Sequence, residues 1–124
     1  MITCDHYGVL GIYPKEPEKI IFAPPINLTQ TIDTTGAGDA FGAGLVSRLY
    51  RSGFSFLDFY GAIDEARVWA AYACCYVGGS ADCPTPQQLK DFKHSRLKVS
   101  EEVEVLDHRA IKPILRLLEK IYCF

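Results

Sequence analysis

The stretch Asp33-Thr34-Thr35-Gly36-Ala37-Gly38-Asp39-Ala40-Phe41-Gly42-Ala43-Gly44 decides how the rest of this chain is interpreted. An extended segment ends here in small residues, and a helical pattern begins directly after them. Small residues let the backbone approach a ligand closely. The N–H groups at a helix start lack intrahelical partners, and the macrodipole adds partial positive charge there. The stretch therefore predicts an anion site, most naturally for phosphate.

Asp39 is the candidate catalytic residue of this stretch. A carboxylate at a phosphate-binding helix start would repel a resting phosphate, but it suits a base that takes the proton of an attacking hydroxyl. On this hypothesis the amides of Gly36, Ala37 and Gly38 stabilise charge on the transferring group. The competing interpretation is that Asp39 only caps the helix, as Asp often does in a first turn.

Two other glycine-rich loops compete with this interpretation. Gly36-x-Gly38-x-x-x-Gly42 is similar to a dinucleotide fingerprint, and Asp58 lies near the distance of a ribose-binding acid. However, Asp58 is expected at a helix start and not at the end of a second strand, and Asp39 would face the pyrophosphate. A Walker loop is excluded because no Gly-Lys-Ser/Thr follows the glycines.

Before this stretch the pattern predicts short strands. Residues 2–4, 9–13 and 19–23 are apolar and rich in β-branched side chains, and residues 14–18 form a polar, proline-bounded loop. Residues 27–33 are expected to be extended. Because a strand pattern begins directly after Met1, we expect the chain to be a truncated or partial gene product.

After this stretch the pattern predicts helices. The first runs over about 37–51 and ends near Gly53; the second starts at a capping box of Ser55 and Asp58 and continues to about 77. Residues 68–77 are apolar on every side, which predicts a buried helix. A third helix starts at 85–88, with Thr85 at the cap, Pro86 at the first helical position and Gln88 able to reach back to the cap. Residues 103–106 form a short strand, and residues 111–122 have helical spacing. Strands followed by helices predict part of an α/β layer architecture.

Composition excludes several classes of protein. The 124 residues carry a net charge of −2, so no basic surface for nucleic acid or for anionic membranes is expected. No apolar run is long enough to span a bilayer and no secretory signal is visible, so we expect a cytoplasmic protein. The five cysteines, an odd number without Cys-x-x-Cys spacing, are expected to be reduced thiols.

Other conspicuous side chains have ordinary explanations. His6, His94 and His108 are scattered and do not predict a metal site. Trp69 and Tyr72 are expected to pack in the core, and contact with an adenine ring is the alternative.

The stretch 33–44 resembles the second signature of the PfkB carbohydrate kinases. This resemblance implies a ribokinase-like fold of three α/β/α layers. Residues 1–124 would be its C-terminal, nucleotide-binding portion, without the N-terminal sugar-binding half and the lid. It also implies a kinase that uses ATP and Mg²⁺ to phosphorylate a sugar or nucleoside, and a homodimer in the full-length protein.

The resemblance also implies roles for single residues. Asp39 matches the base, and Gly36, Ala37 and Gly38 match the anion hole. The side chain of Asp33 and the carbonyl of Thr35 match ligands of a monovalent cation, usually K⁺, to which residues 78–83 should add carbonyls.

One motif departs from the family pattern. Where members carry Thr-x-Gly-x-x-Gly near the nucleotide, this chain has Thr3-Cys4-Asp5-His6-Tyr7-Gly8. Thr3 and Gly8 match as nucleotide-binding residues, and Asp5 stands in the place of the middle glycine. A truncated, non-catalytic binding or regulatory module is therefore the alternative to a kinase.

Overall fold

A computed structural model of the chain describes residues 1–3, 7–78, 83–96 and 103–107. The chain divides into two compact units. One contains Met1–Pro24 and Glu102–Phe124, and the other contains Pro25–Glu101. The predicted helix over 111–122 lies outside the described residues. Among the described helices, none is long and apolar enough to cross a membrane.

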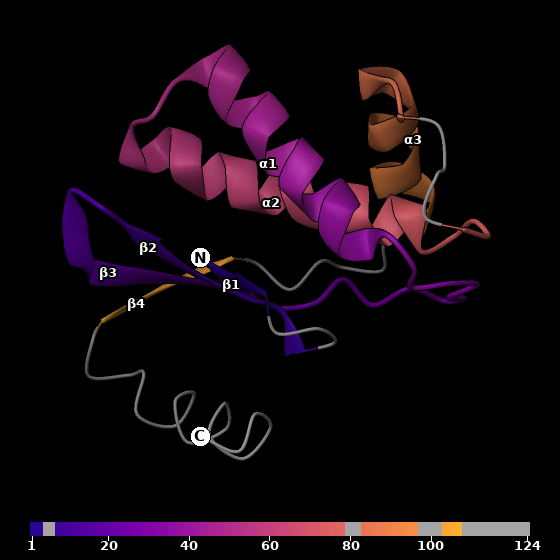
Figure 1. The fold of residues 1–124 in the computed structure, drawn as a ribbon, viewed down its shortest axis with the longest axis horizontal. Helices are drawn as coiled ribbons and strands as arrows, with labels where there is room; N and C mark the ends of the chain where they lie inside the picture. Colours follow the sequence, from indigo (N-terminus) through magenta and orange to yellow (C-terminus); the bar gives the residue numbers. More distant parts are fainter. Residues whose placement is uncertain (4–6, 79–82, 97–102, 108–124) are drawn as a thin grey trace. The chain divides into compact units, whose positions relative to one another are not determined.

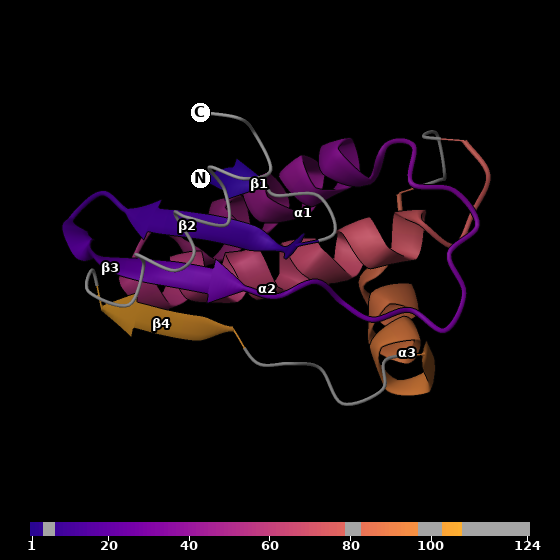
Figure 2. The same ribbon diagram turned by 90° about the horizontal axis from the view of Figure 1, so that it is seen from below.

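The first unit holds a four-stranded antiparallel sheet in the order β1-β2-β3-β4 (Figure 2). The strands are β1 (Ile2–Thr3), β2 (Val9–Tyr13), β3 (Glu16–Ala23) and β4 (Glu104–Asp107). Ile21 is fully buried in the inner strand β3, where it pairs with Gly11 of β2 and Val105 of β4. The predicted strands over 9–13 and 103–106 are confirmed, the second with a shift of one residue.

The predicted loop over 14–18 is wrong in its length. Only Pro14 and Lys15 form the turn, and β3 already begins at Glu16. The pairing with β2 jumps from Tyr13–Glu16 to Ile12–Ile20, which marks an irregularity in the ladder. Pro17 lies inside this irregularity, where a proline does not interrupt a regular ladder, so its presence does not prevent the longer strand.

The second unit contains α1 (Ala37–Ser52), α2 (Phe56–Ala73) and α3 (Pro86–Arg96). Helices α1 and α2 form an antiparallel hairpin, and α3 lies across the C-terminal end of α2 (Figure 1). The predicted bounds of the first helix are confirmed to within one residue. Gly53, expected near its end, follows α1 directly and has φ 107°.

Two helix starts have the predicted side-chain caps. At α2 the Ser55 hydroxyl accepts from the Asp58 N–H, and Asp58 accepts from the Ser55 N–H. At α3 the Thr85 hydroxyl accepts from the Gln88 N–H at 3.2 Å, and Gln88 accepts from the Thr85 N–H at 2.8 Å. Each pair satisfies donors that a helix start leaves without partners.

One buried cluster of the helical unit involves α2 and α3. Its buried side chains are Val68, Trp69, Ala71, Cys75, Leu89 and Phe92. The core interpretation of Trp69 is thereby confirmed, and Tyr72 packs against the same cluster. Helix α1 approaches closely at Gly44, where an added Cβ would lie 2.7 Å from Cγ of Trp69.

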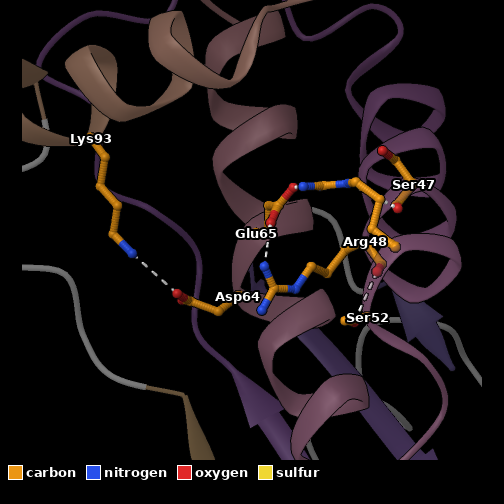
Figure 3. A network of polar contacts seen from close by, with 7 residues as sticks. Ser47, Arg48, Ser52, Asp64, Glu65 and Lys93 are labelled. Atoms are coloured by element: carbon orange, nitrogen blue, oxygen red, sulfur yellow. Dashed lines mark hydrogen bonds and ion pairs between the residues drawn. The ribbon is translucent and has the colours of Figure 1, made fainter.

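Ion pairs join the three helices along α2 (Figure 3). Glu65 of α2 lies 2.5 Å from Arg51 and 3.6 Å from Arg48, both of α1. Asp64 pairs with buried Arg67 at 2.6 Å and with Lys93 of α3 at 3.2 Å. Burial alone would raise the pKa of Asp64, but the hydrogen bond from Arg67 and the nearby charge of Lys93 outweigh it, so the pKa is lowered.

Candidate functional site

A tight turn leads the chain into α1. The Ala37 N–H donates to the Thr34 carbonyl at 3.2 Å, which closes a four-residue turn over 34–37. Gly36 has φ 77° and ψ 0°, the angles of the third residue of a type II β-turn. Only glycine adopts these angles without strain, so the Gly36 of the motif is explained by the backbone alone.

The start of α1 presents backbone donors. Gly36 is the N-cap and supplies no side chain, and α1 begins at Ala37. Within the part of the chain that the structure describes, no acceptor takes the N–H groups of Gly36, Gly38 and Asp39. Of the three amides expected to form the anion hole, the structure therefore leaves those of Gly36 and Gly38 available and shares that of Ala37 with Thr34.

Asp39 lies in the first turn of α1 and is exposed. No hydrogen bond or ion pair engages its carboxylate among the described residues. An added Cβ at Gly38 or Gly42 would meet no atom within 4 Å, so the backbone beside Asp39 is open. This geometry weakens the capping interpretation, because Asp39 makes no bond to its own helix start. Its role as a base stays a prediction.

Asp33 links the turn to a distant part of the chain. One carboxylate oxygen, Oδ1, accepts from the Thr35 N–H, and the other, Oδ2, accepts from the Gly78 N–H, each at 2.9 Å. These backbone bonds, that of Thr35 first, hold the pKa of Asp33 below its ordinary value. Asp33 and Thr35 thus lie together in the turn, and Gly78 joins them from 45 residues away.

The end of α2 differs from the prediction of a helix to about residue 77. Helix α2 ends at Ala73, and Tyr76 and Val77, expected to be buried, are 45% and 82% exposed. The Cys74 carbonyl accepts from the Ile32 N–H at 2.8 Å and the Asp33 N–H at 3.3 Å. Because Asp33 also takes the Gly78 N–H, the chain before α1 occupies the groups that would have continued the helix.

The Cys74 thiol lies near these backbone bonds and near Asp33. Burial raises the pKa of its thiol, and the neighbouring Cys75 and the charge of Asp33 raise it further. A raised thiol pKa disfavours the reactive thiolate. Cys74, Cys75 and Cys83 are free thiols, as expected.

The predicted nucleotide-binding residues Thr3 and Gly8 lie in the sheet unit. Thr3 of β1 pairs with Val9 of β2, which directly follows Gly8. Gly8 is buried with φ 105°, and an added Cβ would lie 2.3 Å from the Ala23 carbonyl oxygen. This position therefore excludes every side chain. Asp5, the departure from the family pattern, lies outside the described residues.

The role of Asp33 and Thr35 as ligands of a monovalent cation stays a prediction. Both carboxylate oxygens of Asp33 already accept a backbone N–H, and the Thr35 side chain forms a further hydrogen bond to the same carboxylate. The described residues contain no group of three His, Cys, Asp or Glu side chains that could hold a metal ion. Most of the segment expected to add carbonyls, residues 79–82, lies outside the described residues.

Sequence reasoning placed Gly78 among the residues that add carbonyls, but it missed the bond from the Gly78 N–H to Asp33 and the role of the Cys74 carbonyl. The glycine at the end of an apolar helix pattern does predict a left-handed C-terminal residue, and Gly78 has φ 81°. Nothing in the sequence indicates that its N–H donates to Asp33.

Comparisons with known proteins show what this chain is similar to. Residues 6–86 match the family described as "pfkB family carbohydrate kinase". A protein of Dictyostelium discoideum named "Uncharacterized sugar kinase" is 33% identical over 88 residues. The match covers 69% of this chain and 24% of that relative, so the chain spans about a quarter of the relative's length. No solved structure matches the chain.

Proposed function

The chain belongs to the pfkB family of carbohydrate kinases, and on that premise we propose that it handles the phosphate in ATP-dependent phosphoryl transfer to a hydroxyl of a sugar or nucleoside. The observation that carries the proposal is the start of α1. There an exposed, unpaired Asp39 lies beside backbone amides that have no acceptor in the described part of the chain.

In this proposal Asp39 accepts the proton of the substrate hydroxyl as its oxygen attacks the γ-phosphorus of ATP. The oxygen–phosphorus bond to the substrate forms, the bond to ADP breaks, and ADP leaves with the bonding electrons. The amides of Gly36 and Gly38 donate to the oxygens of the transferring group, with that of Ala37 in support. Donors that are already oriented stabilise this charge without reorganisation.

Cofactors complete the proposed site. Mg²⁺, when bound with ATP, neutralises phosphate charge. The Asp33 carboxylate and the Thr35 carbonyl would hold K⁺, and Thr3 and Gly8 would contribute to the nucleotide site. We also propose that residues 1–124 form the C-terminal portion of a three-layer α/β/α fold. The part of the protein that selects the sugar, and any dimer contact, would then lie outside them, in keeping with the 24% coverage of the relative.

Calorimetric titration of Mg-ATP into the chain tests the proposal, after circular dichroism has shown that the chain is folded. Binding that strengthens when K⁺ replaces choline in the buffer is the expected result. The Asp39→Asn variant should bind Mg-ATP at least as well as the parent chain, because it removes a negative charge beside the phosphates.

A folded chain that does not bind Mg-ATP contradicts the proposal and favours a non-catalytic module. Binding of NAD in place of Mg-ATP would instead favour the dinucleotide interpretation. The substrate class follows from sugar-dependent ADP formation over a panel of pentoses, hexoses and nucleosides. That assay is run on this chain and, if the gene encodes a longer protein, on the longer protein as well.

A further inference from the structure

The carboxylate of Asp33 bridges two segments that are far apart in the sequence. Its Oδ1 holds the Thr35 N–H and its Oδ2 holds the Gly78 N–H, both at 2.9 Å. The two oxygens thus bind different segments. Oδ1 binds the turn that starts α1, and Oδ2 binds the segment that follows the end of α2. Hydrogen bonds to an ionised acceptor are stronger than those between neutral groups.

Backbone hydrogen bonds connect the same two segments, with the donors now in the segment before α1 and the acceptor at the end of α2. The Cys74 carbonyl accepts from the Ile32 and Asp33 N–H groups. In a continuing α-helix this carbonyl would accept from the N–H of residue 78. Both groups of that missing bond, the Cys74 carbonyl and the Gly78 N–H, are instead bonded to residues 32 and 33. The segment before α1 therefore completes the C-terminal end of α2.

The turn at α1 has little else to hold it. Its N-cap is a glycine without a side chain, and Thr35 and Gly38 are exposed. By contrast, the end of α2 is anchored through Ala71 and Cys75 in the core. A bond from the turn to this end fixes the direction of the amides at 36–39 relative to a rigid part of the unit.

We propose that Asp33 is a positioning residue of the phosphate site, which fastens the turn over 34–37 to the end of α2 through Thr35 and Gly78. This role needs no cation, because both partners are N–H groups of the chain. It rests on the proposed function only for the identity of the ligand. Asp33 does not touch the reacting atoms and acts through the backbone that carries the amides.

Amide hydrogen exchange tests the link without any ligand. In the Asp33→Asn variant one carboxylate oxygen becomes an NH₂ donor and the negative charge is lost. The amide of Thr35 or Gly78 that faces the NH₂ group should then exchange about tenfold faster or more, and the other should also exchange faster. The matched control is Asp58→Asn, which removes a similar bond from Ser55 at the start of α2. In the control, exchange at Thr35 and Gly78 should stay as in the parent chain. Unchanged exchange at both amides in a folded Asp33→Asn protein would overturn the proposal.

Variants at Gly78 decide the question if Asp33→Asn does not fold. A Cβ at Gly78 meets no atom within 4 Å, so only the backbone angle φ 81° opposes a side chain there. Asn tolerates this region and Val does not. Gly78→Asn should keep slow exchange at Thr35, whereas Gly78→Val should accelerate it. Equal exchange at Thr35 in the two variants would count against the link.

Binding of Mg-ATP separates this role from that of a cation ligand. Asp33→Asn should weaken binding about tenfold in choline buffer as well as in K⁺, and Asp58→Asn should leave the affinity unchanged. A loss that appears only in K⁺ buffer would mean that Asp33 acts solely as a cation ligand, which would overturn the proposal. If the parent chain binds no Mg-ATP, the proposed function fails, and the exchange rates alone decide whether Asp33 positions the turn.

Discussion

Helices α1 and α2 each carry an aspartate as their third residue, Asp39 and Asp58, but the two carboxylates are used differently. Asp58 folds back onto its N-cap residue, accepting from the Ser55 N–H at 3.1 Å and from its hydroxyl at 2.6 Å. Asp39 is exposed and makes no bond within the described residues. The N-cap sets the difference, because Gly36 has no side chain with which to form a capping box.

The start of α3 resembles that of α2 and differs from that of α1 in the same way. There Thr85 and Gln88 satisfy each other's backbone N–H groups, as Ser55 and Asp58 do at α2. Two helix starts thus close their own donors with side chains, whereas α1 leaves its donors open at a cost in stability. A helix start without a side-chain cap, beside a free carboxylate, marks the place where a ligand is expected.

Asp39→Asn should give the largest effect, since it removes the proposed base. We expect phosphoryl transfer to fall about 10²–10⁴-fold, whereas Asp58→Asn, the same change at the same helix position, should leave the rate within about twofold. Initial rates of sugar-dependent ADP formation measure both variants. An Asp39→Asn protein that keeps its rate, or an Asp58→Asn protein that loses as much, would remove the functional distinction between the two aspartates.

A second prediction concerns the hairpin that carries both helix starts. Gly44→Ala places a Cβ 2.7 Å from Cγ of Trp69 and should lower the free energy of unfolding by about 1–3 kcal/mol. The control is Gly42→Ala on the same helix, where a Cβ meets no atom within 4 Å and helix propensity should add up to about 1 kcal/mol. Urea unfolding followed by circular dichroism measures both. Effects of the same sign would show that α1 and α2 do not approach each other as described.

Ser55→Ala should have a smaller effect, confined to stability. Loss of the hydroxyl removes an acceptor for the Asp58 N–H and should cost about 1 kcal/mol. Phosphoryl transfer should not change, because this cap lies at the opposite end of the hairpin from the start of α1 (Figure 1). Thermal unfolding and the kinase assay together check the prediction. A Ser55→Ala protein of unchanged stability would mean that the cap is not formed in solution.

The smallest effect is expected from acidification. The hydrogen bond from the Ser55 hydroxyl, followed by that from its N–H, holds the pKa of Asp58 below its ordinary value. A lowered folded-state pKa gives stability that is present above the unfolded-state pKa of about 3.9 and is lost as the pH falls through the folded-state value. Between about pH 5 and pH 2 the parent chain should therefore lose slightly more of its Tm than Asp58→Asn does. Asp33 and Asp64 titrate in both proteins, so their difference isolates Asp58, and parallel Tm curves would contradict the prediction.

Local signals predicted the parts of the fold that depend on neighbours in sequence. The bounds of α1 and the capping boxes at Ser55 and Thr85 were predicted because the residues that form them lie within one helical turn of each other. Amides without partners at the start of α1 were expected for the same reason, although that of Ala37 donates to Thr34.

Errors arose where a distant segment decided the outcome. The end of α2 was placed too late because the residues that interrupt it, Ile32 and Asp33, lie more than one helix away in the sequence. The start of β3 was placed too late because the composition of 14–18 is typical of a loop, while pairing with β2 extends the strand to Glu16. Asp33 was assigned only to a cation, since no pattern indicates its bond to Gly78.

The bond between Asp33 and Gly78 also constrains the order in which the chain can fold. The start of α2 can nucleate from residues within one turn, whereas its end is completed only when a segment 45 residues before Gly78 arrives. Contacts of large sequence separation carry a loop-closure cost that is paid before they stabilise anything. The turn at α1 should therefore acquire its final shape late, after the hairpin has formed, and the Thr35 and Gly78 amides would be among the last in this unit to become protected during refolding.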